Sequence, residues 1–230
     1  MPTLNVNGIN IYYEVHGEGR PLLLILGLGG DVSEYKSTIA GLTRSCRVIA
    51  FDNRGAGRSA KPDTPYSIEL MAGDAAALLD ALDVPRASVL GISLGGRIAM
   101  ELALQHPDRV ERLILASTSA RVIRSPRRAH LWPILSGLPL FRSKHPQPRY
   151  AFVRQFKAST GYDATDRLDV LSMPTLILHG GKDRVAPLAL AEEMHDRIRE
   201  SRMVVFKGGH LFFLMREPQR FLDCVRDFLS

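Results

Sequence analysis

The chain has little of several features that would narrow its class. It has two cysteines in 230 residues, Cys46 and Cys224, and both stand in apolar segments, so we expect neither a disulfide nor a cysteine metal site. No apolar run approaches the roughly 20 residues that span a bilayer. The first residues lack the basic and apolar segments of a secretory signal. We therefore expect a cytoplasmic protein that does not bind a membrane.

Positive charge is only modestly in excess: the chain has 30 Lys and Arg against 24 Asp and Glu, a net charge of +6. The basic residues are spread along the chain without a basic-aromatic motif, so nucleic-acid binding is not expected. One dense basic stretch, residues 121–128, includes Arg124, Arg127 and Arg128. Two interpretations of it stay open: a solvated surface, or a site entrance that attracts anionic substrates.

Short apolar runs alternate with amphipathic segments along most of the chain. At this length, with 45% hydrophobic residues, about one domain with a substantial core is expected. Strands are predicted at residues 3–6, 9–14, 21–26, 46–51, 87–92, 112–117, 174–180 and 203–206. Helices are predicted at residues 33–43, 67–82, 93–105, 187–199 and from 217 to the end.

This alternation predicts the α/β class, with a mostly parallel, doubly wound sheet. Asn7-Gly8 between the first two strands predicts an antiparallel N-terminal hairpin, because both turn positions need positive φ. Between residues 118 and 171 the strand periodicity stops and Pro and Arg become frequent. We interpret 118–171 as a small helical cap inserted into a core domain formed by residues 1–117 and 172–230, because insertions at strand carboxyl ends lie over the ligand crevice.

The chemistry is indicated first by Gly91-Ile92-Ser93-Leu94-Gly95, which stands between a predicted strand and a predicted helix. This is the pattern of a nucleophile elbow, in which a strained turn exposes the serine at the head of a helix. The glycines allow the backbone to pack closely on both sides of the turn. An ordinary glycine-rich turn has the same composition, so a base and an acid must also be found.

His210 is the best candidate base. It follows Gly208-Gly209 just after the last predicted core strand, and Asp183 follows the preceding one. Asp183 could simply close a turn, but the chain order Ser93, Asp183, His210 is the order of an α/β-hydrolase triad. The strand at 112–117 is followed by hydroxyl residues and no carboxylate. His179 also ends a strand, but no neighbouring residues mark it as the base.

An acyl transfer needs two donors for the oxyanion. We predict the backbone N–H groups of Leu28 and Leu94 in this role, with Gly27 and Gly29 of the same glycine-rich loop contacting substrate. No metal-ligand cluster and no phosphate-binding loop occurs in a fitting context, so neither a metal nor a cofactor is expected.

With these parts, nearly the whole chain resembles the α/β-hydrolase superfamily, most of all its small esterase, lactonase and 3-oxoadipate enol-lactonase-like branch. The motifs that carry the resemblance are GISLGG (91–96), FDNRGAGRS (51–59), HGGKD (179–183) and GGH (208–210). Two departures stand out: the family usually has His-Gly where this chain has Leu26-Gly27, and the cap segment is short. The serine at position 93 argues against the dehalogenase and epoxide hydrolase branches, which use aspartate.

The motifs together predict a serine hydrolase that cleaves carboxylic esters of short to medium acyl chain through an acyl-enzyme. A lactone or an acyl-CoA thioester is the alternative substrate. A lyase or cofactor-free haloperoxidase-like activity on the same triad, and a non-catalytic ligand receptor, are rival interpretations, because a fold does not determine a function. The substrate is expected to be a small molecule, and the oligomeric state is left open.

Overall fold

The computed structural model describes residues 2–123 and 144–230. In these residues eight strands form one sheet with the order β1-β2-β4-β3-β5-β6-β7-β8. They are β1 (Thr3–Val6), β2 (Ile9–His16), β3 (Pro21–Ile25), β4 (Arg47–Phe51), β5 (Ala87–Ile92), β6 (Val110–Ala116), β7 (Thr175–Gly180) and β8 (Ser201–Phe206). From β4 to β8 in this order, neighbouring strands are parallel, and β2 is antiparallel to both of its neighbours, β1 and β4. The predicted sheet is confirmed.

The N-terminal hairpin turns at Asn7 and Gly8, which have φ of 48° and 76°. Both residues tolerate positive φ, so the turn forms without strain. The register pairs Val6 with Ile9 and Thr3 with Tyr12. β2 then joins the central sheet beside β4.

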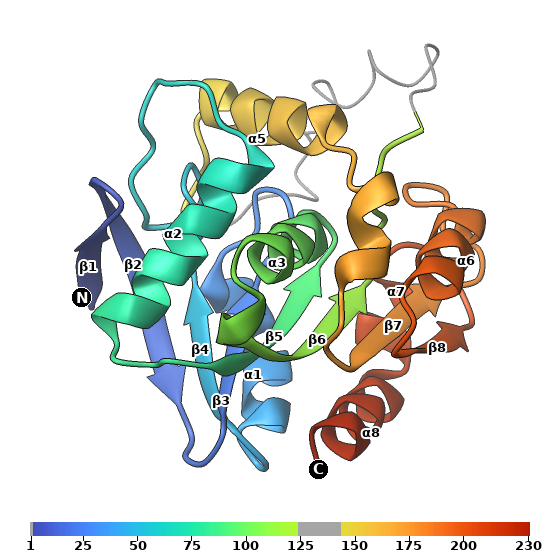
Figure 1. Ribbon diagram of the computed structural model, residues 1–230. Helices are drawn as coiled ribbons and strands as arrows, with labels where there is room; N and C mark the ends of the chain where they lie inside the picture. Colours follow the sequence, from blue (N-terminus) through green and yellow to red (C-terminus); the bar gives the residue numbers. More distant parts are fainter. Residues whose placement is uncertain (1, 124–143) are drawn as a thin grey trace.

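Helices cover both faces of the sheet (Figure 1). One face carries α2 (Ile68–Ala81), α3 (Leu94–Gln105) and α6 (Leu188–Arg197), and the other carries α1 (Lys36–Leu42), α7 (Phe212–Arg216) and α8 (Pro218–Leu229). The short 3-10 helices are η1 (Val32–Tyr35), η2 (Pro107–Arg109) and η4 (Thr165–Val170). The helix predicted at 33–43 is divided at Tyr35 into η1 and α1 because an Asp31 capping box starts a tight 3-10 turn first.

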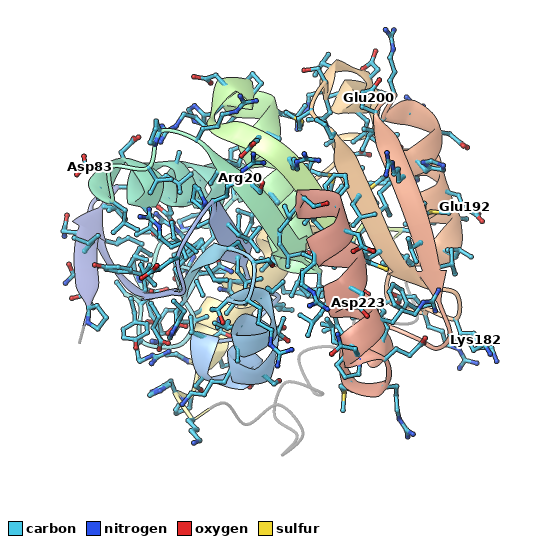
Figure 2. The ribbon with its side chains drawn as sticks, turned by 90° about the horizontal axis from the view of Figure 1, so that it is seen from below. Arg20, Asp83, Lys182, Glu192, Glu200 and Asp223 are labelled. Atoms are coloured by element: carbon cyan, nitrogen blue, oxygen red, sulfur yellow. The ribbon has the colours of Figure 1, made fainter. Side chains whose placement is uncertain are left out.

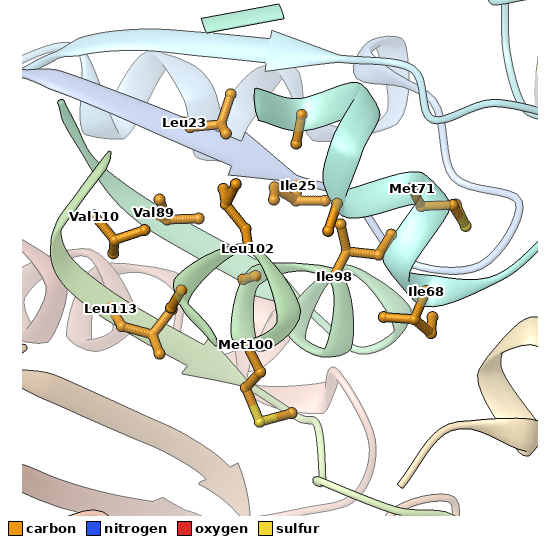
Figure 3. Close-up of a cluster of buried hydrophobic side chains, with 14 of the residues drawn as sticks. Leu23, Ile25, Ile68, Met71, Val89, Ile98, Met100, Leu102, Val110 and Leu113 are labelled. Atoms are coloured by element: carbon orange, nitrogen blue, oxygen red, sulfur yellow. The ribbon is translucent and has the colours of Figure 1, made fainter. Parts of the chain in front are cut away.

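Alternate residues of β3 supply two separate cores. Leu23 and Ile25 pack with α2 and α3, whereas Leu22 and Leu24 pack with α1 and α8. Figure 3 shows the first cluster, in which Leu102 of α3 lies between side chains of β3 and β5. A strand that is apolar on both faces is typical of a parallel sheet covered on both sides.

The order of the strands creates a switch point between β3 and β5, since the chain moves outward from β3 to β4 and then returns to the other side at β5. Ligand crevices of open α/β sheets lie at the carboxyl ends of strands at such a point. The loops after β3, β5, β7 and β8 all leave this one edge, and they carry the residues singled out in the sequence.

The segment predicted as a cap contains α5 (Arg149–Gly161), a longer helix than the short pieces its pattern indicated. In Figure 1 α5 lies across the top of the view, above α2 and α3. Its inner face buries Ala151, Gln155, Ala158 and Ser159, which are small or polar. A helix with this inner face has no apolar periodicity, so the sequence pattern did not reveal it.

Charged side chains of both signs project from separate elements in the view from below (Figure 2). Those labelled there are Arg20, Asp83, Lys182, Glu192, Glu200 and Asp223. Within the described ranges, no helix is long and apolar enough to cross a membrane.

Candidate active site

Ser93 stands at a strained turn between β5 and α3, with φ 56° and ψ −114°. Few side chains adopt this backbone conformation, and the surrounding hydrogen bonds hold it. The Ser93 N–H donates to Ala116 O at 2.9 Å, and Ser93 O accepts from Gly96 N–H at 3.0 Å and from the Thr118 hydroxyl at 2.7 Å. The turn therefore presents the serine side chain at the head of α3, as the pentapeptide predicts.

Two glycines make this turn possible by their lack of a side chain. A Cβ on Gly91 would lie 2.3 Å from Gly95 O, and a Cβ on Gly95 would lie 2.1 Å from Ile25 O. Both contacts are with backbone atoms, which cannot turn aside as a flexible side chain does. The spacing Gly-x-Ser-x-Gly is thus a steric requirement of the close packing of β3, β5 and α3.

Ser93, His210 and Asp183 lie in one line of hydrogen bonds. His210 Nδ1 is 2.7 Å from Asp183 Oδ2, and His210 Nε2 is 2.9 Å from Ser93 Oγ. The Asp183 carboxylate can only accept, so Nδ1 carries the proton and Nε2 of the neutral ring accepts from the serine hydroxyl. This arrangement suits His210 for removing the proton of Ser93.

The Asp183 carboxylate accepts hydrogen bonds both from its own turn and from His210. Its Oδ1 accepts from the N–H groups of Val185 (2.7 Å) and Ala186 (2.9 Å), so the turn interpretation of the sequence also holds. Burial raises the pKa of Asp183, but the hydrogen bonds from His210 and these two N–H groups outweigh it. The net pKa lies below the usual value, so the carboxyl is ionised beside His210.

His179 is a buried neighbour of Asp183. Its Nε2 donates to Ala186 O at 2.8 Å and stands 3.6 Å from Asp183 Oδ2, while its Nδ1 is buried without a partner. Burial lowers the pKa of His179, outweighing the hydrogen bond to Ala186 O and the charge of Asp183. His179 is therefore neutral at pH 7, and it supports the turn that holds Asp183.

The glycine-rich loop after β3 forms a tight turn beside Ser93. Gly30 N–H donates to Gly27 O at 3.2 Å, and Gly29 has φ +71°, a combination typical of a type II turn with Leu28 at its first corner. A Cβ on Gly27 would lie 3.5 Å from Ser93 Cβ. Leu94, the other predicted donor, is the first residue of α3, where a backbone N–H has no intrahelical acceptor.

The loop is also braced from two sides. Asn53 Nδ2 donates to Leu26 O at 2.9 Å, and the Gly29 N–H donates to Gln155 Oε1 of α5 at 3.0 Å. Contacts from the loop after β4 and from α5 therefore hold this loop, which has Leu26 where the family usually has histidine. Because the Gly29 N–H is engaged by Gln155, any contact of Gly29 with a substrate would be made by another atom.

Comparison with known proteins assigns the chain to a family. The family model described as alpha/beta hydrolase fold matches residues 20–158, which is more than half of the chain. The chain belongs to the alpha/beta hydrolase fold family.

Three relatives of this α/β-hydrolase illustrate the range within the family. "Putative carbamate hydrolase RutD" of Azorhizobium caulinodans is 30% identical, with 92% of each chain covered. "3-oxoadipate enol-lactonase 2" of Acinetobacter baylyi is 27% identical, over 97% of this chain and 94% of its own. The crystal structure of the enol-lactonase from Burkholderia xenovorans LB400 superposes with a TM-score of 0.91 at 26% identity, and 99% of each chain is covered. The resemblance to an esterase and lactonase branch is confirmed.

Arg97 of α3 is a buried cation that the sequence analysis missed. It follows Ser93 by four residues, on the same side of α3, and long helical side chains lean back toward the N-terminus. Its guanidinium donates to Ser159 Oγ at 2.9 Å and to Ser119 Oγ at 2.8 Å, while Nε has no partner. No carboxylate in the described residues forms an ion pair with it.

Burial lowers the pKa of Arg97 to about 10, so the group remains a cation at neutral pH. An arginine within an apolar helix pattern gives no sequence signal that it will be buried without a counter-ion. That property depends on which residues α5 and the loop after β6 bring to it.

The basic stretch is only partly described. Arg124, Arg127 and Arg128 lie outside the described residues, and Arg121 pairs at the surface with Glu193 at 3.1 Å. No group of three or more His, Cys, Asp or Glu in the described part of the chain could hold a metal ion.

Proposed function

We propose that this α/β-hydrolase cleaves carboxylic esters of short to medium acyl chain, with Ser93 as nucleophile, His210 as general base and Asp183 as the group that orients His210. The observation that carries the proposal is the unbroken line from the strained elbow: Ser93 Oγ to His210 Nε2 at 2.9 Å, and His210 Nδ1 to an ionised Asp183 at 2.7 Å. A free serine is a weak nucleophile and needs such a base.

In this mechanism Ser93 Oγ attacks the carbonyl carbon of the ester while its proton passes to His210 Nε2. The carbonyl oxygen becomes an oxyanion that accepts hydrogen bonds from the N–H groups of Leu28 and Leu94. When the intermediate collapses, the C–O bond to the alcohol breaks and His210 donates its proton to the leaving oxygen. Water then attacks the acyl-enzyme with His210 again as base, releasing the acid and restoring Ser93.

The test is hydrolysis of p-nitrophenyl esters from acetate to decanoate by wild type and Ser93→Ala. Removing such a nucleophile costs about 10⁶ in rate when it is the catalytic residue. Turnover that is greatest with short chains and lost in the variant supports the proposal. A Ser93→Ala enzyme with near-native turnover would refute it, and a wild type inactive on all of these esters would shift the weight to lactones, thioesters or a non-hydrolytic activity.

A lactone is the second candidate substrate, and the enol-lactonases among the relatives favour it. Ring opening uses the same nucleophile, base and oxyanion donors, because a lactone is an internal ester. A panel of small lactones, followed by acid release at constant pH, separates the two candidates by their kcat/KM. An acyl-CoA thioester is tested in the same way by thiol release.

An anionic substrate within either class is favoured by Arg97, a buried cation without a described counter-ion. Burying an unpaired charge is costly, and a carboxylate of the substrate would offset part of that cost. The assay compares the p-nitrophenyl monoester of glutaric acid with p-nitrophenyl pentanoate. Arg97→Met should lower kcat/KM for the anionic ester by at least tenfold more than for the neutral one. Equal losses exclude this role. The triple neutralisation of Arg124, Arg127 and Arg128 tests the basic stretch in the same assay.

We also infer that residues 118–171 act as the cap of this site. α5 contacts the loops after β3 and β4, through Gln155 to Gly29 and through the Tyr150 hydroxyl to Lys61 O at 2.6 Å. A substrate held at Ser93 would then lie beneath α5. Replacing residues 122–162, between the paired Arg121 and Asp163, by a short linker keeps Thr118 at the elbow and should broaden acyl-chain preference while leaving the hydrolysis of acetate esters measurable.

A further inference from the structure

Gln155 is a buried polar side chain for which the proposed mechanism has not yet given a role. It is 0% exposed and lies on the inner face of α5. Its Oε1 accepts from Gly29 N–H and from Gln147 Nε2, both at 3.0 Å, and its Nε2 donates to Arg54 O at 2.7 Å. A buried amide with both ends engaged rigidifies the segments that it joins.

Those segments surround the predicted oxyanion donor. Leu28 is the first corner of the turn, and Gly29 is the second. The plane that contains the Leu28 N–H also contains Gly27 O, which accepts from Gly30 N–H at 3.2 Å. The next peptide plane contains the Gly29 N–H that Gln155 holds. Two successive peptide planes of the turn are therefore held, one from within the loop and one from α5.

The contact with Gln155 selects one orientation of the peptide between Leu28 and Gly29. Turns of type I and type II differ mainly by a flip of this central peptide. In the observed orientation the Gly29 N–H reaches Oε1 of Gln155 and Gly29 has φ +71°. Without that acceptor the part-buried Gly29 N–H would lose this partner, and the observed orientation of the peptide would no longer be favoured.

We propose that Gln155 is a positioning residue that ties α5 to the glycine-rich loop after β3 (the oxyanion loop), so that the turn that presents the Leu28 N–H keeps its type II form only while α5 is docked. This inference rests on the proposed serine-hydrolase function. It also explains how a chain with Leu26-Gly27 keeps an ordered loop: the brace comes from the cap segment. The side-chain amide of Gln155 thereby couples the oxyanion hole to α5 of the cap segment.

The test uses Gln155→Met, which keeps the length of the side chain and removes its hydrogen bonds. We expect kcat for p-nitrophenyl butyrate to fall by about 10–10²-fold, less than or equal to the typical cost of losing one oxyanion donor, with KM changed by less than threefold. The affinity for a boronic acid, which forms a tetrahedral adduct at a catalytic serine, should fall by the same factor as kcat/KM, because both depend on the oxyanion donors.

The matched control is Arg154→Met, which removes the neighbouring α5 ion pair to exposed Asp63 but no contact of the loop. It should leave kcat and boronic acid affinity within twofold of wild type. Equal losses in the two variants would mean that α5 docking in general is responsible, and would overturn the inference. An unchanged kcat in Gln155→Met, or a change in KM alone, would overturn it as well.

If Gln155→Met does not fold, Gln155→Glu replaces it, because the protonated carboxyl of a buried glutamate accepts from Gly29 N–H and donates to Arg54 O as the amide does. Its kcat should stay within tenfold of wild type, and a greater loss contradicts the inference. Failure of the proposed function has a different signature. In that case wild type itself shows no ester turnover and no Ser93-dependent binding of the boronic acid.

Discussion

Gly95 offers the sharpest test of the steric argument for the elbow. A Cβ at this position would meet Ile25 O at 2.1 Å, Ile25 C at 2.6 Å and Leu26 O at 2.7 Å. All three atoms belong to the backbone at the end of β3, which is buried in the sheet. Gly95→Ala therefore cannot be accommodated by a side-chain rotation, and α3 must move away from β3.

The size of the effect follows from these distances. To bring the 2.1 Å contact to about 3.0 Å, which is still tight, α3 and β3 must separate by about 1 Å. Overpacking of a dense core costs about 1–3 kcal/mol, and the better helix propensity of alanine returns up to about 1 kcal/mol. We expect a net loss of about 1–2 kcal/mol in the free energy of unfolding. Since the displacement lies beside Ser93, kcat should fall by about 10²-fold.

Gly73 is the matched control, because it also lies inside a helix, α2. A Cβ there would meet only Asn7 Nδ2 at 3.6 Å, an ordinary contact. Gly73→Ala should raise the free energy of unfolding by about 0.5–1 kcal/mol and leave kcat unchanged. Urea denaturation followed by far-UV circular dichroism measures both variants, and p-nitrophenyl butyrate hydrolysis measures their activity.

The reasoning fails if Gly95→Ala is as stable as Gly73→Ala, or if it loses stability while kcat stays native. The first result would mean that β3 and α3 have room between them. The second would mean that the position of Ser93 does not depend on the close packing beneath it.

Three other predictions test the site. Asp183→Asn keeps an Oδ1 acceptor for the turn but no longer favours the proton on His210 Nδ1, so kcat should fall by about 10⁴-fold with the fold intact; a loss below tenfold would contradict the role of Asp183. The pKa of buried His179 is lowered from 6.5, so below about pH 6.5 the unfolded chain binds more protons and the free energy of unfolding decreases as pH falls. His179→Gln keeps a donor for Ala186 O and should flatten that slope in pH-dependent urea titrations; an equally steep slope would assign it to other groups. Ser159→Ala deprives the Arg97 guanidinium of an acceptor and should cost about 1–3 kcal/mol in urea denaturation, whereas no change would show that the bond contributes little.

Much of the architecture was predictable because it depends on local rules. Asn7-Gly8 determines its own turn, and the continuous apolar run of β3 requires a strand covered on both faces. Ser93, Asp183 and His210 each follow a predicted parallel strand, which was enough to predict that they meet, since parallel strands bring their carboxyl ends to one edge. Their distances agree with that prediction, and their catalytic roles await the tests above.

The brace of the loop after β3 and the burial of Arg97 could not be predicted from the sequence, because both depend on contacts between distant segments. Gln155 is one polar residue in a stretch without periodicity, and its partners Gly29 and Arg54 lie 126 and 101 residues away. The sequence around Arg97 does not indicate that it is buried, because its burial depends on Ser119 and Ser159, which the fold brings to it. The sequence by itself determined the sheet, the elbow and the three residues in line. Only the tertiary structure decided how the glycine-rich loop after β3 is braced and that Arg97 is buried against Ser119 and Ser159, because hydrogen bonds between distant segments follow from packing and not from local pattern.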